Sequence, residues 1–420
     1  MFHTAELGKH IGWREFRRIK ANCAPYRDGD GNEVQGRYFF ERYSDNGLTF
    51  IYYEPKEGAE RCYPWMKVIV NFAKLLKEAE QIALPGYDEA EKLLQLYNAY
   101  METACMEQRQ LDYTAEEDLE QYQCNTIDLR VQRLDCTMQV SGLTKQEING
   151  YIYIYSHSYR KGFDRLRPRG MSQYDKWGNL LRGERKGSAY FASNEIGVNI
   201  YDKQQQMLNV NESRARKGKQ PKYDAETIEK ASGILRIEFQ CYPGALRYRM
   251  NKINKFKKKG ITCLRTLENV LNAQISEDII FSYLERLAWK QPHINLRSAE
   301  KIIDNKQRMT GKVKVRLLQI LRAGTIKGRR MHEVKSFIDE PKYFTADLKK
   351  IRDLGFNPIL LPINGYPSNL ENLYNVLKQQ TKLWGFDTDD LHEDYAPSGD
   401  YDVFEEYTTE ELAEDEDIIS

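Results

Sequence analysis

The chain has 420 residues, of which 41% are hydrophobic and 30% are charged, and its formal net charge is +1. This composition is typical of a globular protein with two or three hydrophobic cores. No run of about 18 apolar residues and no signal-peptide core occurs, which argues against a membrane-spanning or secreted protein and leads us to expect a cytoplasmic one.

The distribution of cysteines and charges further limits the class of protein that this sequence can encode. The seven cysteines are scattered singly, without a C-x-x-C pair, so neither a zinc site nor a disulfide framework is expected. Residues 151–260 contain 24 Lys and Arg against 10 Asp and Glu, whereas residues 385–420 contain 15 acids and no Lys or Arg. The basic middle segment indicates a polyanion such as nucleic acid as partner, and the acidic tail is expected to be disordered.

The first half of the chain mixes strand and helix patterns. "GLTFIYY" and "MKVIVNF" read as strands, and "YDEAEKLLQLYNAYMETACMEQ" reads as a helix. "NTIDLRVQRLDCTMQVSG" and "EINGYIYIYSHSY" both alternate and are predicted to be strands. Residues 160–187 combine Lys and Arg with Gly, Pro and aromatic residues, which predicts a loop or hairpin outside the core.

The second half changes from strands to helices. "GSAYFASNEIGVNIYDKQQQ" predicts two short strands joined near Asn194. The polar residues 211–230 predict a helix or a mobile insertion, and "GILRIEFQCY" predicts a further strand. Beyond about residue 245 the apolar period becomes 3.6, as in "TLENVLNAQISEDIIFSYLERLAW" and "KVKVRLLQILRAG". "PKYFTADLKKIRDLGF" predicts a compact helix, with Thr345 as N-cap and Gly355 as its end.

These elements predict an α+β fold with a central antiparallel sheet, a duplicated strand set and a helical C-terminal domain. The expected domains are an N-terminal α+β half (1–110), a catalytic half (111–262), a helical DNA-binding or accessory domain (263–384) and a disordered acidic tail (385–420).

Three predicted strands each carry one apolar and one polar face, because side chains alternate along a strand. The polar faces hold Arg133, Asp135 and Thr137 on the first, Asn199, Tyr201 and Lys203 on the second, and Arg236, Glu238 and Gln240 on the third.

If the three strands share a sheet, Asp135, Tyr201, Lys203 and Glu238 converge. Two carboxylates for a hard divalent cation, a phenol and an ammonium are the groups that phosphoryl transfer to a tyrosine requires. A sheet solvated on one face, with Asp135 paired to an arginine, produces the same alternation.

The sequence resembles, over about residues 38–365, the gene II/X replication initiators of filamentous phages, which are grouped with rolling-circle initiators. "QRLDCTMQV" is similar to the "R-[IL]-D-x-T" strand of that family, and "GVNIYDKQQQ" to its "Y-x-K" nucleophile motif. "SGILRIEFQCY" is similar to its "SG-L-[VI]-R-[FI]-E" segment, and "PKYFTADLKKIRDLGF" to its C-terminal segment.

The resemblance implies a fold like that of nicking initiators and a role for each matching residue. Tyr201 would attack a phosphodiester at the origin, Lys203 would assist it, and Asp135 and Glu238 would bind Mg²⁺ or Mn²⁺. The product would be a 5′-phosphotyrosine link and a free 3′-hydroxyl primer.

Two features depart from related initiators. Gln206 stands where an acid often follows the tyrosine, so Asp202, Glu195 or water would complete the metal shell. The chain also has no His-x-His pair, and His157 is the histidine expected near the site. An oxygen-bound metal is therefore expected, not zinc.

Basic and aromatic residues around the expected site predict DNA contacts, through salt-dependent backbone binding and base stacking. They are Arg165, Arg167, Arg169, Lys176, Trp177, Arg182, Arg185, Lys186, Arg236, Arg247, Arg249, Lys257 and Lys258. The helix in 335–356 is a candidate for major-groove contact or, equally, for a core-packed helix.

The favoured function is an origin-nicking and strand-joining endonuclease in the cytoplasm of a bacterial host. Its expected partners are double-stranded and single-stranded origin DNA and the host helicase and polymerase, without a membrane, and a homodimer is left open. Two alternatives remain: a DNA-binding control protein without nicking activity, and a metal-dependent nuclease that cuts by water attack.

Overall fold

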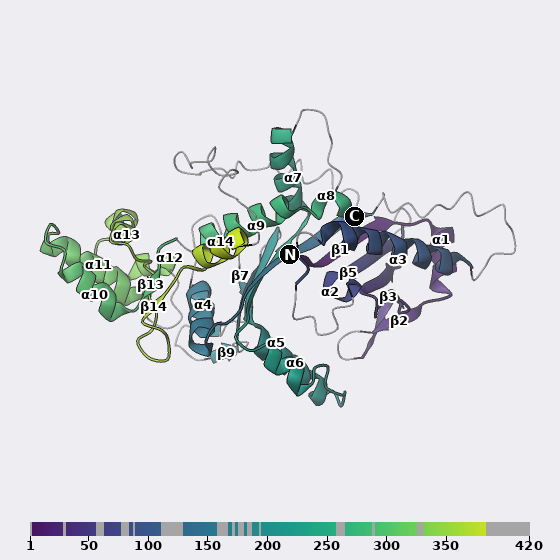
Figure 1. Ribbon diagram of the computed structural model, residues 1–420, viewed down its shortest axis with the longest axis horizontal. Helices are drawn as coiled ribbons and strands as arrows, with labels where there is room; N and C mark the ends of the chain where they lie inside the picture. Colours follow the sequence, from purple (N-terminus) through teal and green to yellow (C-terminus); the bar gives the residue numbers. More distant parts are fainter. Residues whose placement is uncertain are drawn as a thin grey trace.

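The computed structural model describes most of the chain (Figure 1). The described residues are 2–27, 31–55, 63–76, 84–86, 89–110, 129–157, 167–169, 173–174, 180–182, 187–192, 195–257, 265–287, 290–325 and 331–383. The acidic tail from residue 385 lies outside them. None of the described helices combines the length and hydrophobicity that a bilayer span needs.

A ten-stranded antiparallel sheet forms the centre of the molecule, in the order β2-β3-β4-β5-β1-β6-β12-β11-β10-β7. Its strands are β1 (Phe2–His10), β2 (Ala24–Arg27), β3 (Glu33–Phe40), β4 (Leu48–Tyr53), β5 (Trp65–Asn71), β6 (Arg130–Val140), β7 (Arg167–Arg169), β10 (Ser188–Ala192), β11 (Ile196–Asp202) and β12 (Leu235–Cys241). Two small two-stranded sheets are β8 (Gln173–Tyr174) with β9 (Leu180–Arg182), and β13 (His293–Ile294) with β14 (Asn369–Leu370).

The large sheet consists of two halves with the same topology. In the first half, β1 is followed by helix α1 (Trp13–Lys20), and β2 to β5 then return so that β5 pairs with β1. In the second half, β6 is followed by helix α4 (Lys145–His157), and β7, β10, β11 and β12 return so that β12 pairs with β6. Antiparallel pairing of β1 with β6 joins the halves. This strand order agrees with the expected duplicated strand set.

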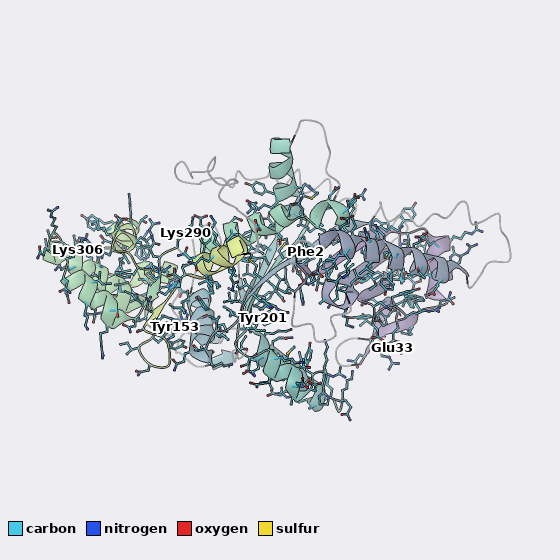
Figure 2. All side chains as sticks on the ribbon, in the orientation of Figure 1. Phe2, Glu33, Tyr153, Tyr201, Lys290 and Lys306 are labelled. Atoms are coloured by element: carbon cyan, nitrogen blue, oxygen red, sulfur yellow. The ribbon has the colours of Figure 1, made fainter. Side chains whose placement is uncertain are left out.

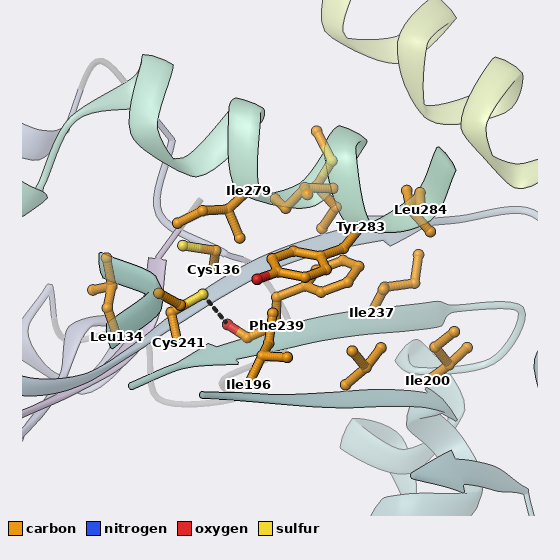
Figure 3. Close-up of a cluster of buried hydrophobic side chains, with 14 of the residues drawn as sticks. Leu134, Cys136, Ile196, Ile200, Ile237, Phe239, Cys241, Ile279, Tyr283 and Leu284 are labelled. Atoms are coloured by element: carbon orange, nitrogen blue, oxygen red, sulfur yellow. Dashed lines mark hydrogen bonds between the residues drawn. The ribbon is translucent and has the colours of Figure 1, made fainter. Parts of the chain in front are cut away.

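One face of the sheet is continuously apolar across the junction of the halves. The register places Ala5 of β1 opposite Leu134 of β6, and Cys136 of β6 opposite Phe239 of β12, all fully buried. On the same face Tyr283 stacks on Phe239, with ring centroids 5.9 Å apart (Figure 3). Burial of these side chains fixes the strand register, because a one-residue shift would move every apolar side chain to the other face.

Helices pack against this sheet in both halves. The first half has α1, α2 (Phe72–Leu75) and α3 (Ala90–Gln110), and the second has α4, α7 (Pro243–Lys257), α8 (Leu267–Val270), α9 (Ala273–Leu287) and α14 (Leu373–Leu383). Because α8, α9 and α14 contact β6, the expected domain boundary at residue 263 does not separate the helices from the sheet.

One expectation for local structure was wrong. Residues 147–157 of the predicted strand "EINGYIYIYSHSY" belong to helix α4, and the buried residues Ile148, Tyr151 and Tyr155 follow a spacing of three to four. A run of alternating tyrosine and isoleucine fits either structure, and packing decided here for the helix. The N-terminal residues, for which the sequence patterns led to no prediction, form the central strand β1.

The basic segment 160–187 takes part in the sheet more than its composition predicted. Its strand β7 pairs with β10 and forms an edge of the ten-stranded sheet, and β8 pairs with β9 as the expected hairpin.

The helices between α9 and α14 form a separate group, on the left in Figure 1. They are α10 (Leu296–Asp304), α11 (Gly311–Gly324), α12 (Met331–Val334), η3 (Lys335–Phe337), η4 (Pro341–Tyr343) and α13 (Phe344–Asp353). Thr345 lies inside α13 and does not cap it, because the helix begins at Phe344. Gly355 follows the helix at a positive φ of 91°, as expected of its end.

An ion pair between a buried arginine and a partly buried aspartate fastens α7 to α9. Arg249, which is 3% exposed, donates to Asp278 at 2.6 Å and to Ser282 at 2.6 Å. Arg249→Ala should lower the free energy of unfolding by about 3 kcal/mol, because it leaves Asp278 without its buried partner. Urea unfolding of this variant and of Arg247→Ala, whose side chain is exposed, measures the effect. Equal stability of the two variants would contradict this role for the ion pair.

Candidate functional site

The polar face of the second half gathers the residues that the sequence singled out. The register places Tyr201 opposite Arg236, Thr137 opposite Glu238, and Gln240 opposite Asp135. The sequence correctly predicted which face of β6, β11 and β12 each of these residues occupies. Figure 2 shows that Tyr201 lies near the middle of the molecule, where the strands meet the helices that follow them.

Tyr201 and Glu238 are joined by a short hydrogen bond. The Tyr201 hydroxyl donates to Glu238 Oε1 at 2.5 Å, and the two residues are 5% and 6% exposed. Burial raises the pKa of Tyr201 well above its usual value, and the charge of Glu238 raises it further, whereas Arg236 acts in the opposite direction. Glu238 is therefore placed to accept the phenol proton.

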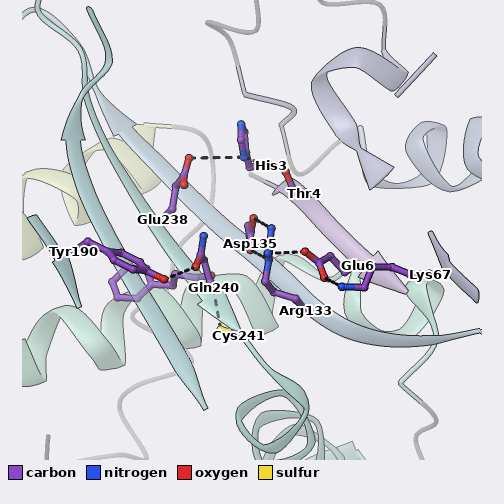
Figure 4. A network of polar contacts seen from close by, with 11 residues as sticks. His3, Thr4, Glu6, Lys67, Arg133, Asp135, Tyr190, Glu238, Gln240 and Cys241 are labelled. Atoms are coloured by element: carbon purple, nitrogen blue, oxygen red, sulfur yellow. Dashed lines mark hydrogen bonds and ion pairs between the residues drawn. The ribbon is translucent and has the colours of Figure 1, made fainter. Parts of the chain in front are cut away.

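His3 of β1 reaches the same carboxylate. Its Nδ1 lies 3.7 Å from Glu238 Oε1 (Figure 4). Burial lowers the pKa of His3 to about 4, against the opposing charge of Glu238. The ring is therefore neutral at physiological pH.

Asp135 belongs to an ion-pair chain that crosses the junction of the halves. Arg133 donates to both Asp135 oxygens, at 2.9 and 3.2 Å, and contacts Glu6 at 2.6 Å. Glu6 in turn pairs with Lys67 of β5 at 2.7 Å (Figure 4). Burial raises the pKa of Asp135 to about 7. The charge of Arg133 opposes this shift, and the charge of Glu238 adds to it.

The sequence predicted that Lys203 lies on the same strand as Tyr201. In the structure it is instead the first residue of helix α5 (Lys203–Arg216). Its side chain is 3% exposed, and Nζ donates to Gln206 Oε1 at 3.2 Å. Gln206, which stands in the position where an acid was expected, is therefore a partner of the lysine. Asp202 is unsuited to the metal role considered for it, because it caps α5 through Gln205 N and pairs with Lys145.

Two residues expected to contact DNA are buried instead. Arg236 is fully buried and donates to Gln139 Oε1 at 2.9 Å, and Arg249 forms the ion pair with Asp278. Both positions are inaccessible to a phosphate backbone, so we assign Arg236 to the surroundings of Tyr201 and Arg249 to the packing of α7.

The other expected DNA contacts are partly described. Arg247 is exposed on α7, and the backbones of Arg167 and Arg169 lie in β7 and that of Arg182 in β9. Lys257 is the last residue of α7. Arg165, Lys176, Trp177, Arg185, Lys186 and Lys258 lie outside the described residues.

Of two other tyrosines near Tyr201 in sequence, only Tyr190 shares its face of the sheet. The Tyr190 hydroxyl donates to Gln240 Oε1 at 3.1 Å, beside Gly197 (Figure 4). Tyr223 is buried against Met207 in a small separate core.

The described residues of this site supply some of the ligands that a divalent cation needs. Asp135 and Glu238 face the same side of neighbouring strands, and the Thr137 hydroxyl between them is buried without a hydrogen-bond partner in the described structure. Within the described ranges, however, no group of three or more His, Cys, Asp or Glu is arranged to hold a metal. Oxygen donors of this kind suit Mg²⁺ or Mn²⁺.

Sequence reasoning missed the contribution of β1. His3, Thr4 and Glu6 all line the polar face, and the alternation of "FHTAELGKH" was the available signal. The expected histidine, His157, is instead on α4, where Nδ1 hydrogen-bonds the Tyr153 carbonyl oxygen at 2.8 Å.

Comparisons with known proteins give little support for a family. A scan against family models and a search of curated proteins found no match. One solved structure, "Structure of Rolling Circle Replication Initiator Protein from Geobacillus stearothermophilus", is 14% identical and has a TM-score of 0.27. That match covers 68% of this chain and 84% of the other chain.

Lys203 should give the protein a distinctive pH dependence. Burial lowers the pKa of Lys203 from 10.5 to about 7, with a further lowering by Arg236. Between these two values the unfolded chain holds a proton that the folded chain lacks, so a rise in pH across this window favours folding.

Lys203→Met should therefore stabilise the protein most at pH 7 and progressively less toward pH 10.5, with a change of up to about 1.4 kcal/mol per pH unit for one proton. Urea unfolding across this pH range tests the expectation, with Lys219→Met as a control because Lys219 is exposed. A difference from wild type that does not vary with pH would show that Lys203 stays charged in the folded state.

Proposed function

We propose that this protein is a rolling-circle replication initiator that nicks and rejoins origin DNA through Tyr201, as the filamentous-phage resemblance implies. The observation that carries the proposal is the hydrogen bond from Tyr201 to Glu238, with Arg236 and Lys203 in the same buried polar cluster. Because burial raises the pKa of Tyr201, the proposed attack needs a base beside the phenol, and Glu238 occupies that position.

In the proposed reaction, the Tyr201 oxygen forms a bond to phosphorus as the bond from phosphorus to the 3′ oxygen breaks. Glu238 takes the phenol proton, and the released 3′ oxygen acquires a proton to become the primer hydroxyl. Arg236 and Lys203 stabilise the negative charge that develops on the phenolate. One phosphodiester replaces another, so reversal of the step can close a displaced strand.

A divalent cation, Mg²⁺ or Mn²⁺, would supply charge stabilisation at the transferring phosphate. Asp135 and Glu238 are the residues proposed to hold it, Glu238 through Oε2, since its Oε1 accepts the Tyr201 hydroxyl. The proposed macromolecular partners are origin DNA and the host helicase and polymerase that extend the primer, in the cytoplasm of a bacterial host. A homodimer stays a prediction.

A second function, DNA binding without nicking, is favoured by the burial of Tyr201. At 5% exposure its hydroxyl points to Glu238, so attack on DNA requires that neighbouring groups move apart. A protein that has lost nicking has no need for such movement.

Tyr201→Phe should abolish a covalent protein–DNA adduct, since it removes the attacking oxygen. Glu238→Gln should slow adduct formation by about 10²- to 10⁴-fold, the usual contribution of a general base. Each variant is mixed with Mg²⁺ or Mn²⁺ and single-stranded or supercoiled DNA carrying the element's own origin, and SDS-resistant adducts are measured on gels.

Tyr190→Phe is the matched control, because Tyr190 lies on the same face and loses only its bond to Gln240. The proposal holds if the wild type and Tyr190→Phe form the adduct and Tyr201→Phe does not. Nicking by Tyr201→Phe without an adduct would identify water as the attacking group. Binding of the origin by every variant, with no nicking, would identify a DNA-binding control protein.

Metal binding is expected to depend on Asp135. Asp135→Asn should weaken Mn²⁺ affinity at least about 10-fold, because it removes one of the two proposed carboxylate ligands. Isothermal titration of the DNA-free protein with MnCl₂ measures affinity independently of activity, with the exposed-site variant Asp304→Asn as control. Equal affinity in the wild type and Asp135→Asn would remove Asp135 from the metal site.

A further inference from the structure

A helical arm, residues 203–232, is inserted between the two strands that carry Tyr201 and Glu238. It consists of α5 and α6 (Ala225–Lys230), leaves the sheet directly after β11 and returns into β12. In Figure 1 the arm projects from the end of the sheet, away from α7, α8 and α9. The tip of the arm is therefore separate from the surface of the sheet, but the chain connects it directly to the two strands of the candidate site.

The base of the arm is fixed to the sheet at both of its ends. Asp202 caps α5 and pairs with Lys145 of α4, and the Lys203 amide donates to the Ile234 carbonyl at 3.0 Å. Gly233 makes the return turn at a positive φ of 72°, where a Cβ would lie 2.9 Å from the Leu143 carbonyl oxygen. These contacts orient the arm relative to Tyr201.

The tip of the arm is folded and not an open loop. Asn211 donates to the Tyr223 carbonyl at 2.6 Å, and its side-chain oxygen accepts from the amides of Lys222 and Tyr223 at 2.8 and 3.1 Å. Met207, Tyr223 and Ala231 form a small core beneath it. The side chains of the tip are therefore presented in a defined arrangement.

The tip has a strongly basic composition. Residues 213–223 ("SRARKGKQPKY") contain five Lys and Arg and no Asp or Glu. Arg216, Lys217, Lys219 and Lys222 are exposed, and Arg214 bonds the Gln220 carbonyl through Nε at 2.7 Å. Exposed lysine and arginine side chains on a folded tip are suited to contact the phosphates of a nucleic-acid backbone. The tip has no exposed aromatic side chain on which a base could stack.

The length of the arm sets where it would touch DNA. Helix α5 has 14 residues, which corresponds to about 21 Å at 1.5 Å per residue. This length equals about six base pairs at 3.4 Å each. If DNA enters the site at Tyr201, the tip can reach the backbone about half a helical turn away.

We propose that the tip of the helical arm binds the phosphate backbone of duplex DNA beside the cleavage position, and so holds the duplex while the strand at Tyr201 reacts. This inference rests on the proposed function, because it takes DNA as the substrate. It assigns the arm a positioning role without sequence recognition, since Lys and Arg contacts to phosphates carry no base information.

The test compares two triple variants that lose the same charge. One carries Lys217→Gln, Lys219→Gln and Lys222→Gln at the tip of the arm, and the control carries Arg14→Gln, Arg17→Gln and Lys92→Gln on helices α1 and α3. All six side chains are exposed, so both proteins are expected to fold. Affinity for a fluorescent duplex of about 30 base pairs is measured between about 50 and 200 mM NaCl.

For the tip variant, we expect the magnitude of the slope of log K against log salt to fall by about 2.7, which is about 0.9 for each lost phosphate contact. The control should keep the wild-type slope. Equal slopes for the two triple variants would overturn the role of the arm, even if Tyr201 still forms its adduct on origin DNA. Absence of both duplex binding and adduct in the wild type would overturn the proposed function together with the arm.

Discussion

The buried polar face of β6, β11 and β12 is the constraint on which the rest of the site depends. Charged groups removed from water must find partners or change their protonation, because an unpaired buried charge is costly. Tyr201 donates a hydrogen bond to Glu238, Arg133 pairs with Asp135, and Lys203 and His3 have lowered pKa values. One cluster thus contains both a proton acceptor and groups that titrate near neutrality, which is the combination that acid–base chemistry requires.

The duplicated topology explains how such a face can be maintained. The apolar faces of both halves lie on the same side of the sheet, so helices can cover that side and leave the polar side for function. The junction strands β1 and β6 contribute directly, since Arg133 connects Asp135 in one half to Glu6 and Lys67 in the other. The N-terminal half is therefore part of the electrostatic environment of the candidate site.

Rigid and projecting elements have distinct roles in this arrangement. Strands hold Tyr201, Asp135 and Glu238 at fixed positions, as precise chemistry requires. The helical arm begins at the residue after Asp202, so one helix joins its tip to the strand that carries the tyrosine. In the proposed function, chemistry and duplex positioning are thus linked through one continuous segment of chain.

The sequence alone determined the strands β4, β5, β6, β11 and β12, the polar and apolar face of each site strand, and the α+β class, because alternation is a local property of the chain. It did not determine that residues 147–157 are helical or that β1 is central, since both depend on which surfaces the residues pack against. The burial of Arg236 and Arg249 and the contact of His3 with Glu238 were likewise decided by tertiary structure. A sequence shows where a charge lies along the chain, but its partner and its access to water depend on segments that are brought together only by folding.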